Sequence, residues 1–265
     1  IAQYHQSCSR IDQGLGHLVS LLKETGQWDN TVLIYTADHG MAFPGGKTTV
    51  YEPGLRVPFI VRHPEAKKRG VVNNAMISHV DITPSILDLA KAYDPEKQAP
   101  LKLISAAKVP SGENGGKPAK AYHGRSWVPI LEEASPKGWD EIGASHTFHE
   151  IQMYYPMRVV RDRKYKLIWN IAWRQPYPFA SDLWRASTWQ AQFAKGAEAP
   201  YGKRTVDAYT NRPQFELYDI SSDPAEAHNL AEDPAFAKVL TSYRSKLKDM
   251  QKRTEDPWII KWHYE

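Results

Sequence analysis

Residues 31–58, TVLIYTADHGMAFPGGKTTVYEPGLRVP, decide how this chain folds. They begin with a short, β-branched apolar run at 31–37, which predicts a buried strand that leads directly into Asp38 and His39. A second apolar run at 57–61 predicts another buried strand. An acid and an imidazole at the carboxyl end of a strand are typical of the active-site edge of an open α/β sheet. The stretch therefore predicts an α/β fold with a functional site directly after the first strand.

Asp38 and His39 are the candidate metal ligands of this stretch. A carboxylate and a neutral imidazole can both bind a divalent cation. Because calcium prefers oxygen ligands, the imidazole keeps manganese, magnesium and zinc open as alternatives. In the simpler interpretation, Asp38 only caps a turn and His39 lies on the surface.

Lys47 is the candidate anion-binding residue of the same stretch. It follows Gly45 and Gly46, and glycines allow the backbone to turn tightly and to approach a ligand. A lysine ammonium can hold an anionic oxygen as a point charge. The alternative is an ordinary solvated loop lysine. Further along, Glu52 and Arg56 are expected to form a salt bridge that shapes the loop.

His149 and Glu150 form a second candidate pair, which precedes an aromatic run that contains Tyr154 and Tyr155. Sugar sites often combine a carboxylate and an imidazole with aromatic faces. The alternative is an exposed loop pair without a ligand. Arg158, a few residues later, is expected to form a structural ion pair within a strand.

Composition limits the classes of protein to which this chain can belong. Its 265 residues allow one large domain or two moderate ones, and a hydrophobic content of 42% is enough for a core. The net charge of +4 comes without a block of lysine and arginine, so no nucleic acid is expected as a partner. The apolar runs are too short to span a bilayer, so no membrane is expected either. Because the chain begins with Ile1 inside a predicted helix, we expect a fragment of a longer protein.

Residues 1–135 show the alternation of helix and strand signals that an α/β domain requires. Apolar residues recur every three or four positions over 4–25, which predicts a helix with the single cysteine on its buried stripe. A third strand is expected at 75–79, followed by a helix over 83–90 that opens with Thr-Pro. Residues 91–120 are rich in proline, glycine and charge, which predicts a long surface loop or insertion.

Residues 136–265 predict a smaller α+β subdomain with an antiparallel sheet and a long C-terminal helix. Alternating apolar positions on both sides of a polar tripeptide favour a hairpin, and later segments favour one more strand and an amphipathic helix. The expected elements are a hairpin of 157–161 and 165–169, a strand at 215–219 and a helix over 235–254.

Several motifs resemble the sulfatase branch of the alkaline-phosphatase-like hydrolases. They are DHG at 38–40, GGK at 45–47, YEPGLRVP at 51–58, VDITPSILDLA at 80–90, HGRSWVPIL at 123–131 and ELYDISSDPAEAHNLA at 216–231. The segment SHTFHEIQMYYPMRVVRDRKYKLIWN at 145–170 resembles the sulfamidase (heparan N-sulfatase) type of that family. The resemblance covers nearly the whole chain, but only the carboxyl-terminal half of such an enzyme.

The resemblance implies both a fold and an activity. The fold is part of an alkaline-phosphatase-like α/β/α sandwich followed by the smaller α+β subdomain. The activity is hydrolysis of sulfate esters or sulfamates of sulfated sugars, with N-sulfoglucosamine among the candidates. Family members use a formylglycine made from the cysteine of a Cys-x-Pro/Ala-Ser-x-Arg motif, together with an Asp-Asp pair. This chain has neither: Cys8 is followed by Ser9 and Arg10 at the wrong spacing, so the formylglycine is expected in a missing amino-terminal part.

The resemblance also implies roles for individual residues. Asp38 and His39 would bind a divalent metal, with calcium the first choice. Lys47 would bind sulfate and act in catalysis, and His149 and Glu150 would contact the sugar. The expected partner is a sulfated sugar or a glycosaminoglycan fragment, a homodimer remains open, and the compartment would be periplasmic, secreted or lysosome-like.

Two alternatives to a sulfatase remain open at this point. The first is a phosphonate or phosphate ester hydrolase of the same superfamily, because the same corner serves phosphoryl transfer. The second is a non-catalytic binding module with a sulfatase-like fold that has lost its nucleophile.

Overall fold

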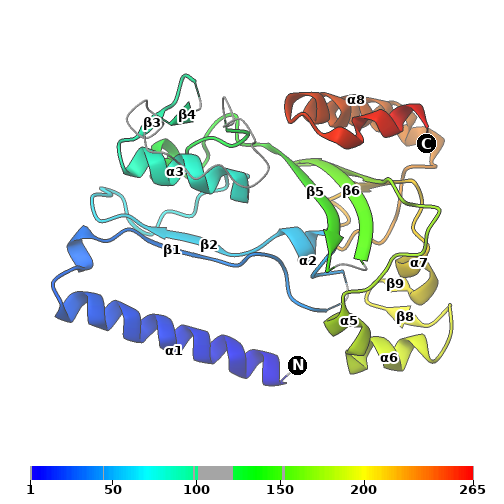
Figure 1. The fold of residues 1–265 in the computed structure, drawn as a ribbon, viewed down its shortest axis with the longest axis horizontal. Coiled ribbons are helices and arrows are strands. Elements are labelled where there is room, and N and C mark those ends of the chain that lie inside the picture. The colour runs from blue at the N-terminus through cyan, green and yellow to red at the C-terminus, as the bar shows by residue number, and fades with distance from the viewer. Residues whose placement is uncertain (1, 44, 98, 101–121, 151–152, 265) are drawn as a thin grey trace, which may run out of the picture.

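Two regions make up the described part of the molecule, which comprises residues 2–43, 45–97, 99–100, 122–150 and 153–264 of a computed structural model. In Figure 1 a first region, residues 2–140, contains α1, the β1–β2 pair and α3. A second region, residues 141–264, lies beside it and is built around a four-stranded sheet. The domain boundary that the sequence predicts between residues 135 and 136 stays a prediction.

The first region begins with a long helix and a strand pair. Its elements up to residue 62 are α1 (Ala2–Glu24), η1 (Trp28–Asn30), β1 (Leu33–Thr36), α2 (Glu52–Leu55) and β2 (Phe59–Arg62). β1 and β2 pair in antiparallel register, with Leu33 opposite Arg62 and Thr36 opposite Phe59. The structure confirms the helix and both strands that the sequence predicts here, although the strands are only partly buried.

Helix α1 carries no buried residue, and this corrects one expectation. Cys8 is exposed, and the apolar side chains of Ile11 and Leu18 are 54% and 47% exposed. The apolar stripe exists in the sequence, but no residue of it is buried, and Tyr4 near its start contacts the ring of Phe43 edge to face. No helix in the described ranges is both long and apolar enough to cross a membrane.

The remainder of the first region is organised around a short helix. Its elements are η2 (His79–Asp81), α3 (Ile82–Leu89), β3 (Tyr93–Asp94), β4 (Ala99–Pro100) and η3 (Val128–Ile130). The carboxylate of Asp81 accepts hydrogen bonds from the backbone N–H groups of Ser78 (2.8 Å) and Arg125 (2.8 Å), which fixes the entry into the predicted helix. The expected strand at 75–79 is wrong, because these residues join no ladder. Of the predicted loop, residues 98 and 101–120 lie outside the described residues.

The second region contains an antiparallel sheet with the strand order β10-β7-β6-β5. Its strands are β5 (Glu141–His149), β6 (Met153–Asp162), β7 (Tyr165–Asn170) and β10 (Phe215–Asp219). The backbone N–H groups of Lys164 and Tyr165 both donate to the Asp162 carboxylate at 3.0 Å, which closes the β6–β7 turn. The predicted hairpin and the predicted strand at 215–219 are both confirmed.

Helices cover both faces of this sheet because successive residues of a strand point to opposite sides. On one face, side chains such as Val159 and Ile168 pack towards α5 (Ser181–Arg185), α6 (Ser187–Phe193) and α7 (Val206–Thr210), beside the short strands β8 (Pro200–Tyr201) and β9 (Arg204–Thr205). On the other face, Val160 and Leu167 pack under α8 (Ala237–Arg253), with η4 (Pro234–Phe236) and η5 (Pro257–His263) at its ends. The predicted amphipathic helix is therefore confirmed, and it covers this face of the sheet.

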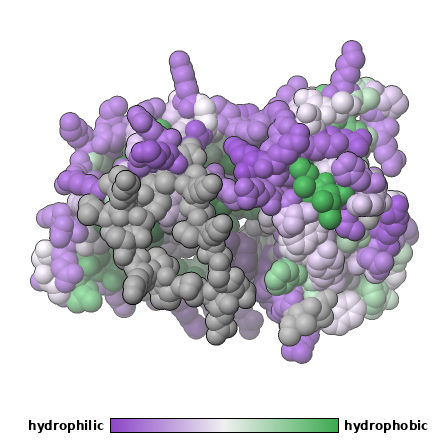
Figure 2. Space-filling view, turned by 45° about the horizontal axis from the view of Figure 1, so that its top comes forward, coloured by the Kyte–Doolittle hydropathy of each residue, from purple (hydrophilic) through white to green (hydrophobic). Residues whose placement is uncertain are grey.

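Figure 2 shows one face of the molecule, on which most of the coloured surface is hydrophilic. Hydrophobic side chains appear there as small patches between hydrophilic ones. This pattern agrees with the two covered faces of the sheet, whose apolar residues lie inside the second region.

Candidate active site

Asp38 and His39 follow β1 directly and contact each other. Nε2 of His39 lies 3.4 Å from Oδ2 of Asp38, and Nδ1 of His39 lies 2.8 Å from the carbonyl oxygen of Gly40. A carbonyl oxygen can only accept a hydrogen bond, so Nδ1 donates its proton to Gly40, and Nε2 is the ring nitrogen that faces the carboxylate. The other carboxylate oxygen, Oδ1, accepts the backbone N–H of His39 at 2.9 Å. Asp38 therefore caps the turn and still presents one oxygen beside the imidazole.

This pair fits part of a divalent metal site. A hydrogen bond from one ring nitrogen to a backbone carbonyl is the usual way in which a ligating imidazole is oriented. The side chains of Asp38 and His39 are 85% and 41% exposed, so both donors are accessible. Within the described residues, no group of three or more His, Cys, Asp or Glu side chains gathers as a metal site would require. Asp38 and His39 can thus supply two ligands of a larger set.

The loop after His39 folds back on itself and carries Lys47. The backbone N–H of Gly40 donates to the carbonyl of Gly54 at 3.0 Å, and that of Lys47 donates to Met41 at 2.8 Å. A Cβ atom at position 40 would lie 1.6 Å from the carbonyl oxygen of Pro53, so only glycine permits this approach. The strand end and the lysine are therefore parts of one closed loop.

Lys47 forms an ion pair that the sequence does not reveal. Its Nζ lies 2.5 Å from Oδ2 of Asp182, the second residue of α5, and the lysine side chain is only 17% exposed. The alternative of a freely solvated loop lysine is therefore wrong. The hydrogen bond from Lys47 holds the pKa of the Asp182 carboxyl below its usual range. Asp182 lies 135 positions from Lys47 in the sequence, so no local pattern could have paired them.

His149 and Glu150 lie at the end of β5, beside the same short helix. Oε1 of Glu150 accepts a hydrogen bond from the hydroxyl of Ser181 at 2.9 Å, and Nε2 of His149 lies 3.8 Å from that carboxylate oxygen. Ser181 and Asp182 are consecutive residues of α5. The structure thus brings Glu150 and Lys47 to neighbouring positions of one helix. Asp38 and His39, in contrast, contact each other and Gly40.

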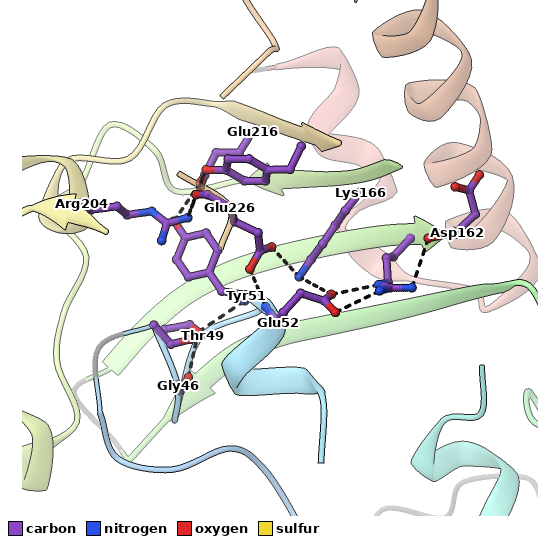
Figure 3. Close-up of polar contacts among 12 residues, drawn as sticks. Gly46, Thr49, Tyr51, Glu52, Asp162, Lys166, Arg204, Glu216 and Glu226 are labelled. Atoms are coloured by element: carbon purple, nitrogen blue, oxygen red, sulfur yellow. Dashed lines mark hydrogen bonds and ion pairs between the residues drawn. The ribbon is translucent and has the colours of Figure 1, made fainter. Parts of the chain in front are cut away.

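A buried charge cluster anchors the loop on the second region (Figure 3). The carboxylate of Glu52 receives two hydrogen bonds from Arg161, at 2.9 and 3.0 Å, and one from Lys166 at 3.2 Å. Lys166 also lies 2.7 Å from Glu226, whose other oxygen accepts the backbone N–H of Glu52 at 2.6 Å. The expected salt bridge between Glu52 and Arg56 is therefore wrong.

The pKa values of the two glutamates differ because their surroundings differ. Burial alone would raise the pKa of Glu52, but Lys166 and Arg161 outweigh it and lower that pKa. At Glu226, which is fully buried, burial raises the pKa by more than Lys166 lowers it. Glu52 is thus paired with two cations, Arg161 and Lys166, and Glu226 is paired with Lys166 alone.

A second buried contact fixes the neighbouring residue of the loop. The hydroxyl of Tyr51 donates to Glu216 of β10 at 2.8 Å, and the guanidinium of Arg204 lies 3.8 Å from the centre of the Tyr51 ring. Tyr51, Arg204 and Glu216 are labelled in Figure 3. Away from this loop, Arg158 pairs with Asp256 at 2.6 Å, which confirms its expected structural role.

Comparison with known sequences identifies relatives along the whole chain. A family model described as Sulfatase matches residues 1–92. Human N-sulphoglucosamine sulphohydrolase is 36% identical over 262 residues, which cover 98% of this chain and 49% of the human protein. An ulvan-active sulfatase of Formosa agariphila is 28% identical over 240 residues, which cover 90% of this chain and 40% of that protein. The chain thus spans about half the length, or less, of these curated relatives.

Solved structures share the fold. The structure of BT4656 in complex with its substrate D-glucosamine-2-N,6-O-disulfate aligns with a TM-score of 0.62 at 22% identity, covering 93% of this chain and 39% of that one. A phosphonate monoester hydrolase of Agrobacterium radiobacter aligns with a TM-score of 0.53 at 21% identity, covering 92% of this chain and 40% of that one. Likeness at these identities concerns the fold alone, and it confirms the predicted fold class.

Proposed function

This chain belongs to the sulfatase family, and we propose that it forms part of an enzyme that hydrolyses sulfate esters or sulfamates of sulfated sugars. N-sulfoglucosamine is the first candidate substrate, because the human relative with 36% identity is named for that activity. A sulfated glycosaminoglycan fragment is the broader class of partner. The observation that carries the proposal is that Lys47 and Glu150 contact consecutive residues of α5, Asp182 and Ser181.

Lys47 is the proposed sulfate-binding and catalytic residue. An ammonium has three protons, and the ion pair with Asp182 requires one of them. Two donors then remain for the oxygens of an anion. Because the lysine side chain is mostly covered by protein, its charge acts on the anion with less screening than a solvated lysine would have.

Asp38 and His39 are the proposed metal ligands. The hydrogen bond from Nδ1 of His39 to Gly40 leaves Nε2 as the nitrogen that would bind the cation, beside Oδ2 of Asp38. Calcium is the first candidate, with manganese, magnesium and zinc as alternatives because of the imidazole. When bound, such a cation neutralises charge on the sulfate oxygens. The metal role is tested by Asp38→Ala, which should lower the metal content found by elemental analysis of the complete protein.

His149 and Glu150 are the proposed sugar contacts. The side chain of Glu150 is 32% exposed, and its hydrogen bond from Ser181 fixes the carboxylate in one orientation. A carboxylate held in this way can accept hydrogen bonds from sugar hydroxyls. His149 lies beside it and can take part in the same contact.

The nucleophile is proposed to come from sequence beyond this chain. The chain contains no Cys-x-Pro/Ala-Ser-x-Arg motif, and its single cysteine lies on α1 away from Lys47 in the sequence. On the family pattern, a formylglycine would attack the sulfate, so residues 1–265 alone should release no sulfate. A periplasmic, secreted or lysosome-like compartment follows from the resemblance, and a homodimer remains open.

A phosphonate or phosphate ester hydrolase is the second candidate. The observation that favours it is a relative named as a multifunctional alkaline phosphatase superfamily protein, from Trinickia caryophylli, which is 24% identical over 92% of this chain. The segment at 145–170 favours the sulfamidase type instead, and so does the higher identity of the human relative.

The test is a comparison of substrates with the complete protein that contains this chain. Release of sulfate from N-sulfoglucosamine and from a sulfate ester would be measured beside hydrolysis of a phosphonate monoester. The proposal predicts the highest kcat/KM for one of the sulfated sugars. A higher kcat/KM for the phosphonate ester would favour the second candidate, and no turnover of any substrate would favour a binding module.

A further inference from the structure

Asp182 contacts Lys47 in a way that involves both of its carboxylate oxygens. Oδ2 lies 2.5 Å from the lysine ammonium, and Oδ1 accepts the backbone N–H of Leu183 at 2.9 Å. The second contact fixes the carboxylate in the first turn of α5. The Asp182 side chain is 47% exposed while that of Lys47 is 17% exposed, so the cation is the more covered partner.

The chain segment that precedes Asp182 also holds the backbone next to Lys47. Thr48 has a φ of 64°, which is rare for a β-branched residue and requires support from its surroundings. The hydroxyl of Tyr177 donates to the carbonyl oxygen of Thr48 at 2.7 Å and lies 2.9 Å from its side-chain hydroxyl. Tyr177 is 2% exposed, and its own backbone N–H donates to Thr210 at 2.7 Å. Segment 177–182 therefore contacts the chain at Lys47 twice. Tyr177 binds the backbone of the next residue, Thr48, and Asp182 binds the ammonium of Lys47.

We propose that Asp182 is a positioning residue that holds the Lys47 ammonium in place for an incoming sulfate oxygen. This inference rests on the sulfate-binding role proposed above for Lys47. A free lysine side chain has four rotatable bonds and loses conformational freedom when it binds a ligand. A lysine that is already paired has lost that freedom before the ligand arrives, and two of its protons still point elsewhere. The negative charge of Asp182 opposes anion binding, but solvent around this half-exposed carboxylate screens it.

The test is a double-mutant cycle on kcat and KM for sulfate release by the complete protein. Asp182→Ala should lower kcat/KM by about tenfold, mainly through kcat, because a lysine that must be reoriented is a poorer donor to the transition state. Asp182→Asn keeps the shape and the contact to Leu183 and should lose less. In a Lys47→Ala background, Asp182→Ala should change kcat/KM by less than about twofold, because the group through which it acts is gone.

Asp207 provides the matched control. It is also an exposed acid in the first turn of a five-residue helix, α7, and its carboxylate accepts a hydrogen bond from Asn211 at 2.7 Å. Asp207→Ala should leave kcat/KM unchanged. A loss of rate as large as that of Asp182→Ala would show a general effect of removing a helix-start acid and would overturn the inference.

The outcomes separate the inference from the proposed function. If Lys47→Ala leaves the rate unchanged, the sulfate role of Lys47 fails. If Lys47→Ala is strongly impaired but Asp182→Ala is not, the positioning role alone fails, and it also fails if Asp182→Ala costs the same with and without Lys47. Should Asp182→Ala fold poorly, Asp182→Asn decides: a loss of kcat that vanishes in the Lys47→Ala background supports the inference, and an unchanged kcat overturns it.

Discussion

The second region packs its sheet on both faces, whereas the longest helix of the first region has no buried residue. Val159 and Leu167 in the sheet are fully buried, while α1 carries no buried residue over its 23 positions. The loop that carries Lys47 lies in the first region of the sequence, but it packs against the second region. Its residues Val50 and Tyr51 are 1% exposed and belong to the apolar cluster on the face of the sheet that α5, α6 and α7 cover. The difference teaches that the proposed anion site depends on the second region for its shape.

The largest effect is expected where the two regions are joined by buried charge. Lys166 is 0% exposed and pairs with both Glu52 and Glu226. Lys166→Ala leaves the buried Glu226 without its cation and should lower the free energy of unfolding by about 3–5 kcal/mol. Chemical denaturation of the chain measures this loss. Lys164→Ala, at the exposed turn of the same hairpin, serves as the control and should change stability by less than about 0.5 kcal/mol. A loss below about 1 kcal/mol for Lys166→Ala would show that the buried cluster does not join the regions.

A pair of leucines sharpens the comparison between the two long helices. Leu247 of α8 is fully buried, whereas Leu18 of α1 is 47% exposed. Leu247→Ala removes core packing and should lower the free energy of unfolding by about 2–5 kcal/mol. Leu18→Ala should change it by less than about 0.5 kcal/mol. Equal losses in urea denaturation would mean that α1 is covered in solution, for example by a second copy of the chain.

Acid should weaken the second region through Asp256. Burial alone would raise the pKa of this carboxyl, but hydrogen bonds from Arg158 and Gln251 outweigh it and hold the pKa below its usual range. A carboxyl whose pKa is lower in the folded state stabilises the fold above its unfolded pKa of about 3.9. That contribution is lost as the pH falls through the folded value. Asp256→Asn should therefore flatten the loss of stability below about pH 4. Unfolding titrations that retain the full acid dependence in Asp256→Asn would assign it to other carboxyls.

The sequence predicts the elements whose signals are local, and it misses those that depend on distant partners. Two such elements are the amphipathic helix α8 and the polar turn between β6 and β7. Each is specified by residues that are close together in the sequence, and the sequence predicts both. The expected strand at 75–79 failed because strand formation requires a neighbour. Met76, for example, donates its backbone N–H to Trp139 outside any ladder.

The contacts of the candidate site also fall into local ones, which the sequence predicts, and distant ones, which it does not. The Asp38–His39 contact and the turn at Lys47 follow from adjacent residues and could be expected from the sequence. Asp182 could not, because its partner is 135 positions away and nothing in SDLWR marks the aspartate as special. Likewise, Glu52 pairs with Arg161, 109 positions away, instead of with nearby Arg56.

Turnover of Lys47→Ala in the complete protein tests the central claim, that this loop is held by the second region in order to bind sulfate. Removing one anion-stabilising donor should lower kcat/KM for a sulfated sugar by roughly 30- to 1,000-fold, which is about 2–4 kcal/mol of barrier. The ion pair with Asp182 is partly exposed and contributes at most about 1 kcal/mol to stability, so the melting temperature should fall by only a few degrees. Lys238→Ala, on the exposed side of α8, is the control for loss of a lysine. An unchanged kcat/KM, or a loss that merely follows a large fall in melting temperature, would contradict the account.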